Sequence, residues 1–433
     1  MSSEREHLSP VDAAWYRMDE HGDPADIGSV MLLDGPMDEA RVRATIADRL
    51  GPHKRFHQRV VDSRHHLLPS WEDEPGFSFD AHIDARTLEA PTDAALQELL
   101  SELMSAPLDF DRSPWRLTLI HGVEGGSALF SHVHHCMGDG FALLDMLIGM
   151  ADRDDAPPEP VALEPEPDWI VQARRVAHDL PAGAMSLGHL LLLPFDSKTL
   201  LSGKLAGKRH LAWSQPVPLE RVKQIAHACG GTVNDVLVAA FAGAMRRWLL
   251  EHGGEAPPIR AIVPVNMRPR DVPIDDTHRN WFGLIFLDLP TDKAERQARV
   301  AAVEQEMNRI KKSKEAIVAL GILATLGRAP TVVNHVVEDL FTRKASIMMT
   351  NVPGPRRPLR LAGYTLRDLW GWAPQCGLGC GATIFSYAGH VRIGVRGDQS
   401  ILPYPDALAR WFVEELEAVD AHAVAGLHAP AAH

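Results

Sequence analysis

The stretch SHVHHCMGDGFALLDMLIGM, residues 131–150, carries the pattern that decides the fold. Apolar and polar residues alternate up to a histidine pair, as in a β-strand, and the apolar run after Gly140 is typical of a helix. We therefore predict a strand over Ser127–His135 and a helix over Phe141–Met150. A strand that passes through a glycine-containing turn into a helix indicates an α/β architecture.

The two adjacent histidines cannot both serve one site. Consecutive side chains of a strand point to opposite faces, so one of His134 and His135 should be functional and the other structural. A neutral imidazole at a strand end suits general-base catalysis, because its unperturbed pKa is about 6.5. Asp139 stands where a carboxylate caps a helix, and Gly138 and Gly140 permit a sharp turn and close approach of a substrate. On these residues alone, a structural histidine pair is an equal alternative.

Other chemistries lack a matching pattern. The sequence contains no Gly-x-Ser-x-Gly motif for a serine acyl-enzyme. Cys136 adjoins His135, but neighbouring residues project apart, so a Cys–His nucleophilic pair is not expected. HHxxxD is not a zinc spacing, and Cys376 and Cys380 alone make no zinc site, so we expect no metal.

Strands and helices are predicted throughout the chain, which excludes an all-α or all-β fold. Before residue 150, a strand over Trp115–His121 pairs with the one described above. After residue 210, we predict helices over Val233–His252 and Pro403–Val419, and strands over Ile259–Val265, Leu284–Leu289, Ser346–Thr350, Ala382–Ser386 and His390–Val395.

The composition is that of a globular chain: 433 residues, 45% hydrophobic and 23% charged, enough for two to four folding units. The net charge of −13 argues against nucleic-acid binding. Four cysteines make no disulfide framework, so a reducing compartment is expected. The N-terminus lacks a secretory pattern, and we expect a cytoplasmic location.

One segment, residues 152–168, differs sharply from the rest, with five prolines, seven acids and one Arg. It predicts an extended linker. The domain prediction is therefore an N-terminal lobe over residues 1–151, a linker and crossover over 152–210, and a C-terminal lobe over 211–433. The linker contributes −6 of the −13, so the acidic balance says little about the lobes.

Two segments combine basic and apolar residues, Leu180–His210 and Arg309–Leu326. Either could lie on a lipid interface. For the first, a crossover packed between two domains is the favoured alternative.

HHCMGDG, residues 134–140, matches the HHxxxDG motif of acyltransferases with the chloramphenicol acetyltransferase-like fold, which includes peptide-synthetase condensation domains. With further segments in order, the chain resembles the bacterial wax ester synthase/acyl-CoA:diacylglycerol acyltransferase family. These segments are LSPVDAAWYRMDEHGDPADIGSVMLLDG from Leu8, SPWRLTLI from Ser113, VNDVLVAAFAGAMRRWL from Val233, VPVNMRPR from Val263, RNWFG from Arg279, TNVPGP from Thr350 and SYAGHVRIGV from Ser386.

The resemblance implies a two-lobed α/β fold with mixed sheets and a tunnel between the lobes. It implies transfer of a long-chain acyl group from acyl-CoA, the co-substrate, to diacylglycerol or a long-chain alcohol, with no cofactor. It also implies peripheral association with the inner membrane or lipid droplets. Two alternatives remain, a carrier-protein-dependent condensation or offloading acyltransferase of the same fold and a non-catalytic lipid-droplet-binding protein.

The family's site residues carry over by motif. His135 would be the general base that deprotonates the acceptor hydroxyl for direct attack on the thioester, and His134 would be structural. Asn266 would donate a hydrogen bond to the developing oxyanion. Asp139 would hold the loop by pairing with Arg268, or with Arg270 as the second candidate.

The remaining motif residues have less specific roles. Asn234 and Asp235 form the family's Asn-Asp motif, and Thr232 with Asp235 predicts a capping box. Gly140 has a structural place in HHxxxDG. Predicted substrate-binding residues are Gly138, Trp115, Thr350, Asn351 and Ser386, although packing is the favoured role for Trp115. The chain departs from the family in Ser113-Pro114-Trp115, which replaces Pro-Leu-Trp, and in Cys136, where Ala is common.

Overall fold

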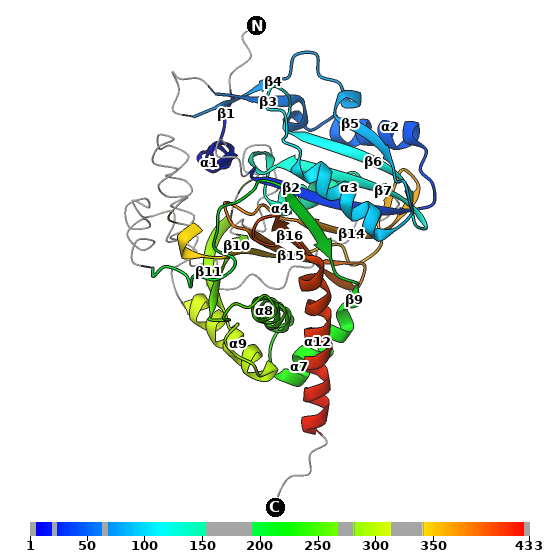
Figure 1. The fold of residues 1–433 in the computed structure, drawn as a ribbon. Coiled ribbons are helices and arrows are strands. Elements are labelled where there is room, and N and C mark those ends of the chain that lie inside the picture. Colours follow the sequence, from blue (N-terminus) through cyan, green and yellow to red (C-terminus); the bar gives the residue numbers. More distant parts are fainter. Residues whose placement is uncertain are drawn as a thin grey trace, which may run out of the picture.

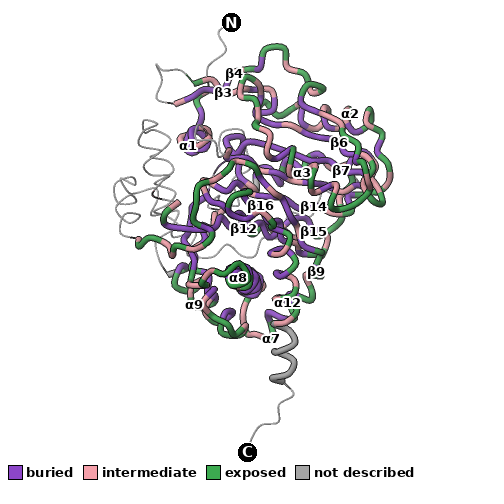
Figure 2. The backbone as a smooth tube through the Cα atoms, in the orientation of Figure 1, coloured by how far each residue is buried: buried purple, intermediate pink, exposed green. Residues whose placement is uncertain are grey.

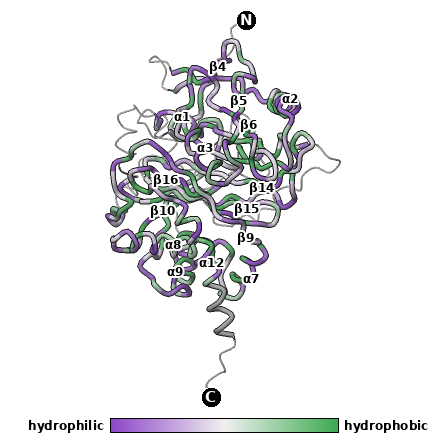
Figure 3. The backbone as a smooth tube through the Cα atoms, turned by 45° about the vertical axis from the view of Figure 1, so that its right-hand side comes forward, coloured by the Kyte–Doolittle hydropathy of each residue, from purple (hydrophilic) through white to green (hydrophobic). Residues whose placement is uncertain are grey.

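Two β-sheets stacked face to face form the molecule (Figure 1). The computed structural model describes residues 6–19, 24–62, 68–152, 193–266, 280, 282–312, 340 and 342–427. Most strand residues of both sheets are buried, and exposed segments lie at the periphery (Figure 2). Hydrophilic stretches are visible on outer helices such as α2 and α9 (Figure 3). This is the mixed α/β architecture that the sequence predicted.

The N-terminal sheet has six strands in the order β13-β14-β2-β7-β6-β5. All neighbours are antiparallel except β5 and β6. Its strands are β2 (Asp26–Asp34), β5 (Ile83–Thr87), β6 (Trp115–Val123), β7 (Gly126–His134), β13 (Arg360–Leu361) and β14 (Tyr364–Trp372). A small separate sheet holds β1 (Glu6–His7), β3 (Gln58–Val61) and β4 (Ser70–Asp73).

The C-terminal sheet has the order β11-β10-β12-β15-β16-β8, and β9 also pairs with β16. β12 runs parallel to both of its neighbours, so this sheet is mixed. Its strands are β8 (Arg209–Trp213), β9 (Val217–Pro218), β10 (Ile259–Asn266), β11 (Phe282–Leu289), β12 (Ile347–Pro353), β15 (Cys380–Tyr387) and β16 (His390–Asp398).

The helices divide between the lobes. In Figure 1, α7, α8, α9 and α12 gather on the face of the C-terminal sheet that points away from the N-terminal lobe. The helices are α1 (Pro10–Met18), α2 (Glu39–Leu50), α3 (Asp93–Ser105), α4 (Gly140–Gly149), α7 (Leu219–Cys229), α8 (Val233–Glu251), α9 (Arg296–Lys312) and α12 (Asp406–Leu427); short 3-10 turns lie at Lys54–His57 (η2), Phe79–Ala81 (η3) and His135–Met137 (η4).

Two apolar cores follow from this layering. One lies in the N-terminal lobe and extends to the facing side of the C-terminal sheet, and the second lies between that sheet and its helices. α8 is apolar almost all round because it is buried in the second core. No single helix among the described residues is long and apolar enough to cross a membrane; α7 and α8 pass that test only as a pair bent by 92°.

The start of α8 confirms the predicted capping box. The Thr232 hydroxyl accepts from the Asp235 N–H at 3.2 Å, and the Asp235 carboxylate accepts from the Thr232 N–H at 2.8 Å. These bonds satisfy orphan donors of the first turn. Asn234 instead accepts from the side chain of Asn351 on β12 at 3.1 Å, so the Asn-Asp motif fixes α8 at its start and to the sheet.

One hairpin crosses the predicted domain boundary. β13 and β14 come from the segment predicted to be C-terminal lobe, yet β14 pairs with β2 and so belongs to the N-terminal sheet. Gly371 of β14 lies where this sheet meets the other one, because a Cβ on Gly394 of β16 would lie 2.5 Å from the Gly371 carbonyl oxygen. The lobes are therefore interleaved, and the sequence division at residue 211 does not describe them fully.

Most predicted elements are present with shifted ends. β6, β7, α4, α8, β10, β11, β12, β15, β16 and α12 correspond to the predicted strands and helices. Sequence patterns gave no prediction for β14, whose alternation is interrupted by the bulge between Leu366 and Asp368. The predicted linker beyond Asp152 lies outside the described residues.

A buried ion pair joins the two sheets. The Arg396 guanidinium of β16 donates to the Asp26 carboxylate of β2 at 2.7 Å and to its carbonyl oxygen at 3.0 Å. His132 of β7 contacts the other carboxylate oxygen at 2.6 Å. Burial alone would raise the pKa of Asp26, but Arg396 and His132 lower it well below its usual value. The carboxylate is therefore charged.

We expect Arg396→Met to destabilise the protein by about 3–5 kcal/mol, because it leaves the Asp26 carboxylate buried without its cation. The double variant Asp26→Asn/Arg396→Met should lose less than the sum of the single losses. Urea unfolding measures both. Arg392→Met is the matched control, since Arg392 lies on the same strand and pairs with Asp368 at a more exposed position. A loss for Arg396→Met no larger than that for the control would contradict the assignment.

Candidate active site

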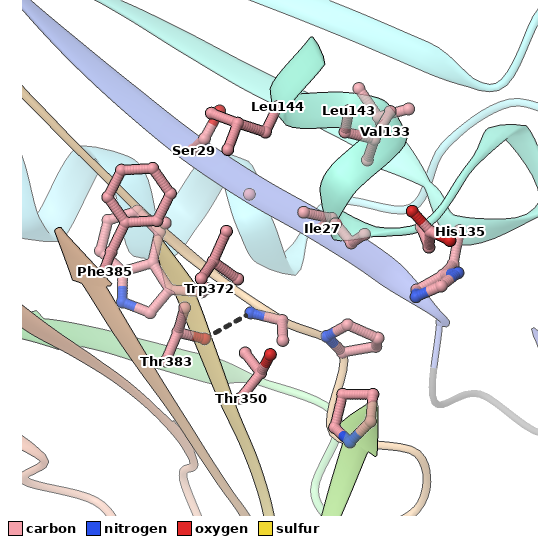
Figure 4. Close-up of a pocket in the computed structure, with 18 of the residues that line it drawn as sticks. Ile27, Ser29, Val133, His135, Leu143, Leu144, Thr350, Trp372, Thr383 and Phe385 are labelled. Carbon is pink, nitrogen blue, oxygen red and sulfur yellow. Dashed lines mark hydrogen bonds between the residues drawn. The ribbon is translucent and has the colours of Figure 1, made fainter. Parts of the chain in front are cut away.

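A cavity lies between the two sheets. Its empty volume is about 1030 Å³, which includes the part open to solvent. Its walls come from β2 and β7 on one side, from β10, β11, β12 and β15 on the other, and from α4 and β14. Figure 4 shows His135 at one end of it. Most of the lining is apolar, including Leu143, Leu144, Met146 and Leu147 of α4.

His135 reaches the cavity because β7 ends one residue earlier. Its N–H donates to the Ala25 carbonyl oxygen at 2.7 Å, and the following residues form the turn η4. Strand alternation places Ser131 and Val133 in the lining as well, and η4 directs His135 to the same side. His134 lies elsewhere, fully buried, with its Nδ1 accepting from the Cys136 N–H at 3.2 Å.

The His135 ring is held by aromatic packing. The Trp15 ring stacks on it with centroids 4.2 Å apart and planes at 22°, and Phe282 lies at 5.6 Å. Its Nδ1 is buried and has no hydrogen-bond partner in the part of the chain that the structure describes. Stacking from α1 and β11, and not a carboxylate, thus fixes the ring.

Asn280 secures the main chain at the same point. Its side-chain NH₂ group donates to the His135 carbonyl oxygen at 2.7 Å and to the Asp12 carboxylate at 2.7 Å. Asp12 and Trp15 stand three residues apart on α1, so this helix contacts the site through both of them. Burial raises the pKa of Asp12 to about 6.

Burial decides the protonation of the site. It lowers the pKa of His135 to about 4 and that of His134 to about 3, because an imidazolium would lose its hydration there. Both rings are therefore neutral at pH 7. Burial raises the pKa of the Cys136 thiol well above its usual value, so this thiol is not a thiolate nucleophile.

The turn after the histidines is capped by Asp139. Its carboxylate accepts from the Ala142 N–H at 2.9 Å, at the start of α4. Arg268 and Arg270, its predicted partners, lie outside the described residues. Gly138 has an extended backbone (φ 164°), and a Cβ on Gly140 would meet Val352 at an ordinary 3.9 Å. The expected need for glycine at these two positions is therefore not supported by the backbone.

Four predicted residues line the cavity with His135: Asp139 and Gly140 in the turn before α4, Asn266 at the end of β10 and Thr350 of β12. The rest of the predicted substrate contacts do not line it. Asn351 lies on the opposite face of β12, toward Asn234. The Ser386 hydroxyl accepts from the Gly354 N–H at 3.3 Å and so holds the VPGP turn.

Trp115 is a packing residue, which corrects its assignment to substrate binding. Its indole N–H donates to the Phe56 carbonyl oxygen at 2.9 Å, and its ring stacks on His82 at 4.6 Å. His82 and the Ser113 N–H both bond to the buried Glu74. The Ser-Pro-Trp motif thus anchors the start of β6, and Trp115 is not among the residues that line the cavity.

Sequence reasoning missed Trp15, Asp12 and Asn280. All three stand in segments that carry the family resemblance, Trp15 and Asp12 in LSPVDAAW and Asn280 in RNWFG. Their roles depend on contacts between α1, η4 and the chain before β11, which are distant in sequence. Among the described residues, no group of three or more His, Cys, Asp or Glu side chains could hold a metal ion.

The geometry agrees with the comparisons to known proteins. The chain matches the family description "wax ester synthase/diacylglycerol acyltransferase catalytic domain" over residues 8–193 and 167–237, and "WS/DGAT C-terminal domain" over residues 279–420. These matches define a CoA-dependent acyltransferase fold with HHxxxDG at its centre. The chain belongs to the wax ester synthase/diacylglycerol acyltransferase family.

Individual relatives cover nearly the whole chain. The probable diacylglycerol O-acyltransferase tgs1 of Mycobacterium tuberculosis H37Rv is 28% identical, covering 93% of each chain. In structure, the wax ester synthase/diacylglycerol acyltransferase from Marinobacter aquaeolei VT8 matches with a TM-score of 0.72 and 24% identity, over 96% of this chain and 100% of that one. The first condensation domain of the CDA synthetase matches with a TM-score of 0.64 and 17% identity, over 97% of each. Both structures show the two-lobed fold.

The depressed pKa of His135 predicts the pH dependence of catalysis. With a free-enzyme pKa of about 4, the imidazole stays unprotonated, and kcat/KM should not fall as the pH is lowered from 8 to about 5.5. An ordinary histidine would halve the rate near pH 6.5. Initial rates at acyl-CoA and acceptor concentrations well below their KM values measure this, with circular dichroism to verify folding at each pH.

Asp12→Asn is the control for this measurement, because Asp12 titrates in the same range. An inflection near pH 6 that disappears in Asp12→Asn belongs to Asp12. An inflection near pH 6.5 that persists in this variant would contradict the assigned state of His135.

Proposed function

We propose that the protein is an acyl-CoA-dependent O-acyltransferase that transfers a long-chain acyl group to diacylglycerol or a long-chain alcohol, giving triacylglycerol or wax ester. The observation that carries this proposal is a neutral His135 facing a largely apolar cavity between two lobes. The family and the names of the relatives support the same activity.

The reaction follows from the position of the base. The acceptor hydroxyl donates a hydrogen bond to the unprotonated imidazole nitrogen of His135. Its oxygen attacks the thioester carbonyl carbon as its proton passes to the ring. The tetrahedral intermediate then expels the CoA sulfur, which takes the proton from the imidazolium. Ester and free CoA leave, and His135 is neutral again.

Asn266 is the proposed hydrogen-bond donor to the oxyanion. It lines the cavity at the end of β10, on the wall that faces β7. A single oxyanion donor typically contributes about 10²–10³ in rate. Asp139, which caps α4, keeps the HHxxxDG turn in shape, and we retain Arg268 as its proposed partner.

The proposed reaction uses acyl-CoA as co-substrate and requires no cofactor or metal ion. Proton transfer and oxyanion stabilisation come from side chains already placed at the cavity. A carrier-dependent condensation activity is the second candidate, since condensation domains share the fold, but the relatives that match over the whole chain are named diacylglycerol O-acyltransferases.

The test supplies labelled hexadecanoyl-CoA with diolein or with hexadecanol and separates the neutral lipids. We expect ester with at least one acceptor, and a loss of at least about 10³-fold in His135→Ala. His390→Ala, at an exposed histidine, is the matched control and should keep full activity. Ester formation only from an acyl carrier protein would favour the condensation activity, and none from any donor would refute the proposal.

We also propose that the protein works in the cytoplasm, bound peripherally to the inner membrane or to lipid droplets. Phe195 supports this proposal, since 62% of its surface is exposed at the end of the apolar LGHLLLLPF stretch. The next residue, Asp196, accepts from the Arg260 N–H and the Ser346 hydroxyl, which joins this residue to the C-terminal sheet. The ammonium group of the buried Lys344 lies 4.5 Å from the centre of the Phe195 ring.

Flotation with vesicles that contain diacylglycerol and anionic lipid tests this surface. Phe195→Asp should lower the bound fraction several-fold, because a charge replaces an interfacial ring. Tyr404→Asp, at another exposed aromatic residue, should bind as the wild type does. Equal binding of all three proteins would show that Phe195 does not contact lipid.

A further inference from the structure

Four hydroxyl groups face one another across the cavity. Ser29 of β2 stands directly opposite Ser131 of β7, and Thr350 of β12 stands directly opposite Thr383 of β15. All four line the cavity. Figure 4 shows Ser29 on one wall and Thr350 and Thr383 on the other, at a distance from His135. We call these four residues the hydroxyl girdle.

Most of the girdle has no protein partner. The hydroxyls of Ser29, Ser131 and Thr350 make no hydrogen bond within the described part of the chain, although Ser131 is only 3% exposed and Thr350 8%. Thr383 accepts from the Ala373 N–H at 2.9 Å and keeps its own proton to donate. The hydroxyl oxygens of these three residues are not among the fully buried unpaired atoms of the described residues, so they open onto the cavity, where a bound molecule or water can pair with them.

The surroundings make the girdle distinctive. The α4 wall is formed by leucine and methionine side chains, and aromatic rings of Trp370, Trp372 and Phe385 complete the lining. A plain alkyl chain fits such a wall. Where it crosses the girdle, however, it would exclude water and leave the hydroxyls unsatisfied, at about 1–3 kcal/mol each.

On the β7 side, the girdle is too far from the base to bind the reacting carbonyl. Ser131 and His135 are four residues apart, which is about 13 Å along an extended strand. A group bound at the girdle therefore belongs to the middle of a chain whose end reacts at His135. Hydroxyl, oxo and ester oxygens can each pair with serine and threonine hydroxyls.

We propose that the cavity selects a long chain that carries an oxygen substituent at mid-chain, which the hydroxyl girdle binds. This inference rests on the proposed acyl transfer, and it names the substrate class of the same site. The oxygenated chain is either that of the acyl donor or that of the alcohol acceptor. Either way the recognised chemistry is the same.

The experiment compares octadecanoyl-CoA with an octadecanoyl-CoA hydroxylated at mid-chain, and, in a second arm, octadecanol with its mid-chain diol. Binding is followed by the fluorescence of Trp15, Trp370 and Trp372, which line the cavity, and turnover by ester formation. In at least one arm we expect the oxygenated chain to be preferred by about tenfold, in both Kd and kcat/KM. The arm that shows the preference identifies the chain concerned.

Variants assign the preference to the girdle. Ser29→Ala/Ser131→Ala removes two of the four hydroxyls and should lower the preference several-fold, with the plain chain bound as well as or better than by the wild type. Ser131→Thr keeps the hydroxyl and should keep the preference. Thermal unfolding of each variant verifies that it is folded.

Three outcomes would overturn the inference: equal Kd values for the plain and oxygenated chains in both arms, no binding of either, or an undiminished preference in the double variant. Equal Kd values would show that the girdle holds only water. Binding with the expected preference but without ester formation would leave the girdle in place and refute the proposed function, so the two failures are distinguishable.

Discussion

Arg396 of the C-terminal sheet and Asp26 of the N-terminal sheet meet in the interior, and neither side chain reaches solvent. A buried ion pair is tolerated only with good geometry and with its remaining polar groups satisfied. Two guanidinium bonds and the contact with His132 provide that geometry. The pair thereby joins β2 of the N-terminal sheet to β16 of the C-terminal sheet, on the face of β2 opposite to Ile27 and Ser29, which line the cavity.

The histidines of β7 lie on one of its two faces, the face that meets the ion pair. His132 lies on the face that meets Asp26 and Arg396, and His134 lies on that same face two residues on. Ser131 and Val133 face the cavity instead, and the turn after the strand adds His135 to that side. A single strand thus contributes to the junction between the lobes with one face and to the active site with the other.

Burial sets the protonation states of His135 and Cys136 at the candidate active site. Burial keeps the imidazole neutral, and in the proposed mechanism the ring forms an imidazolium only when the oxyanion forms nearby. No carboxylate is needed to hold the ring, since Trp15 stacks on it and Asn280 fixes its carbonyl oxygen. The protonated Cys136 thiol offers no competing nucleophile.

The sequence predicted what depends on local patterns. The strand and helix around HHxxxDG, the capping box at Thr232 and most central strands have periodicities or end signals that are readable from neighbouring residues. It did not predict β14, because a bulge breaks the alternation and its partner β2 is more than 300 residues away. Trp15 and Asn280 were missed for the same reason, since their roles arise from packing between distant segments. For Trp115, which the motif placed among the substrate-binding residues, the structure supports the packing role that the sequence analysis favoured.

The central claim is that His135 acts as a base in a direct attack on the thioester, with no acyl group carried by the protein. Intact-mass spectrometry of the enzyme, quenched during incubation with acyl-CoA in the absence of acceptor, tests it most directly. The account predicts an unchanged protein mass, followed by ester formation when acceptor is added. A stoichiometric increase by one acyl group, formed at least as fast as turnover and discharged on addition of acceptor, would contradict it.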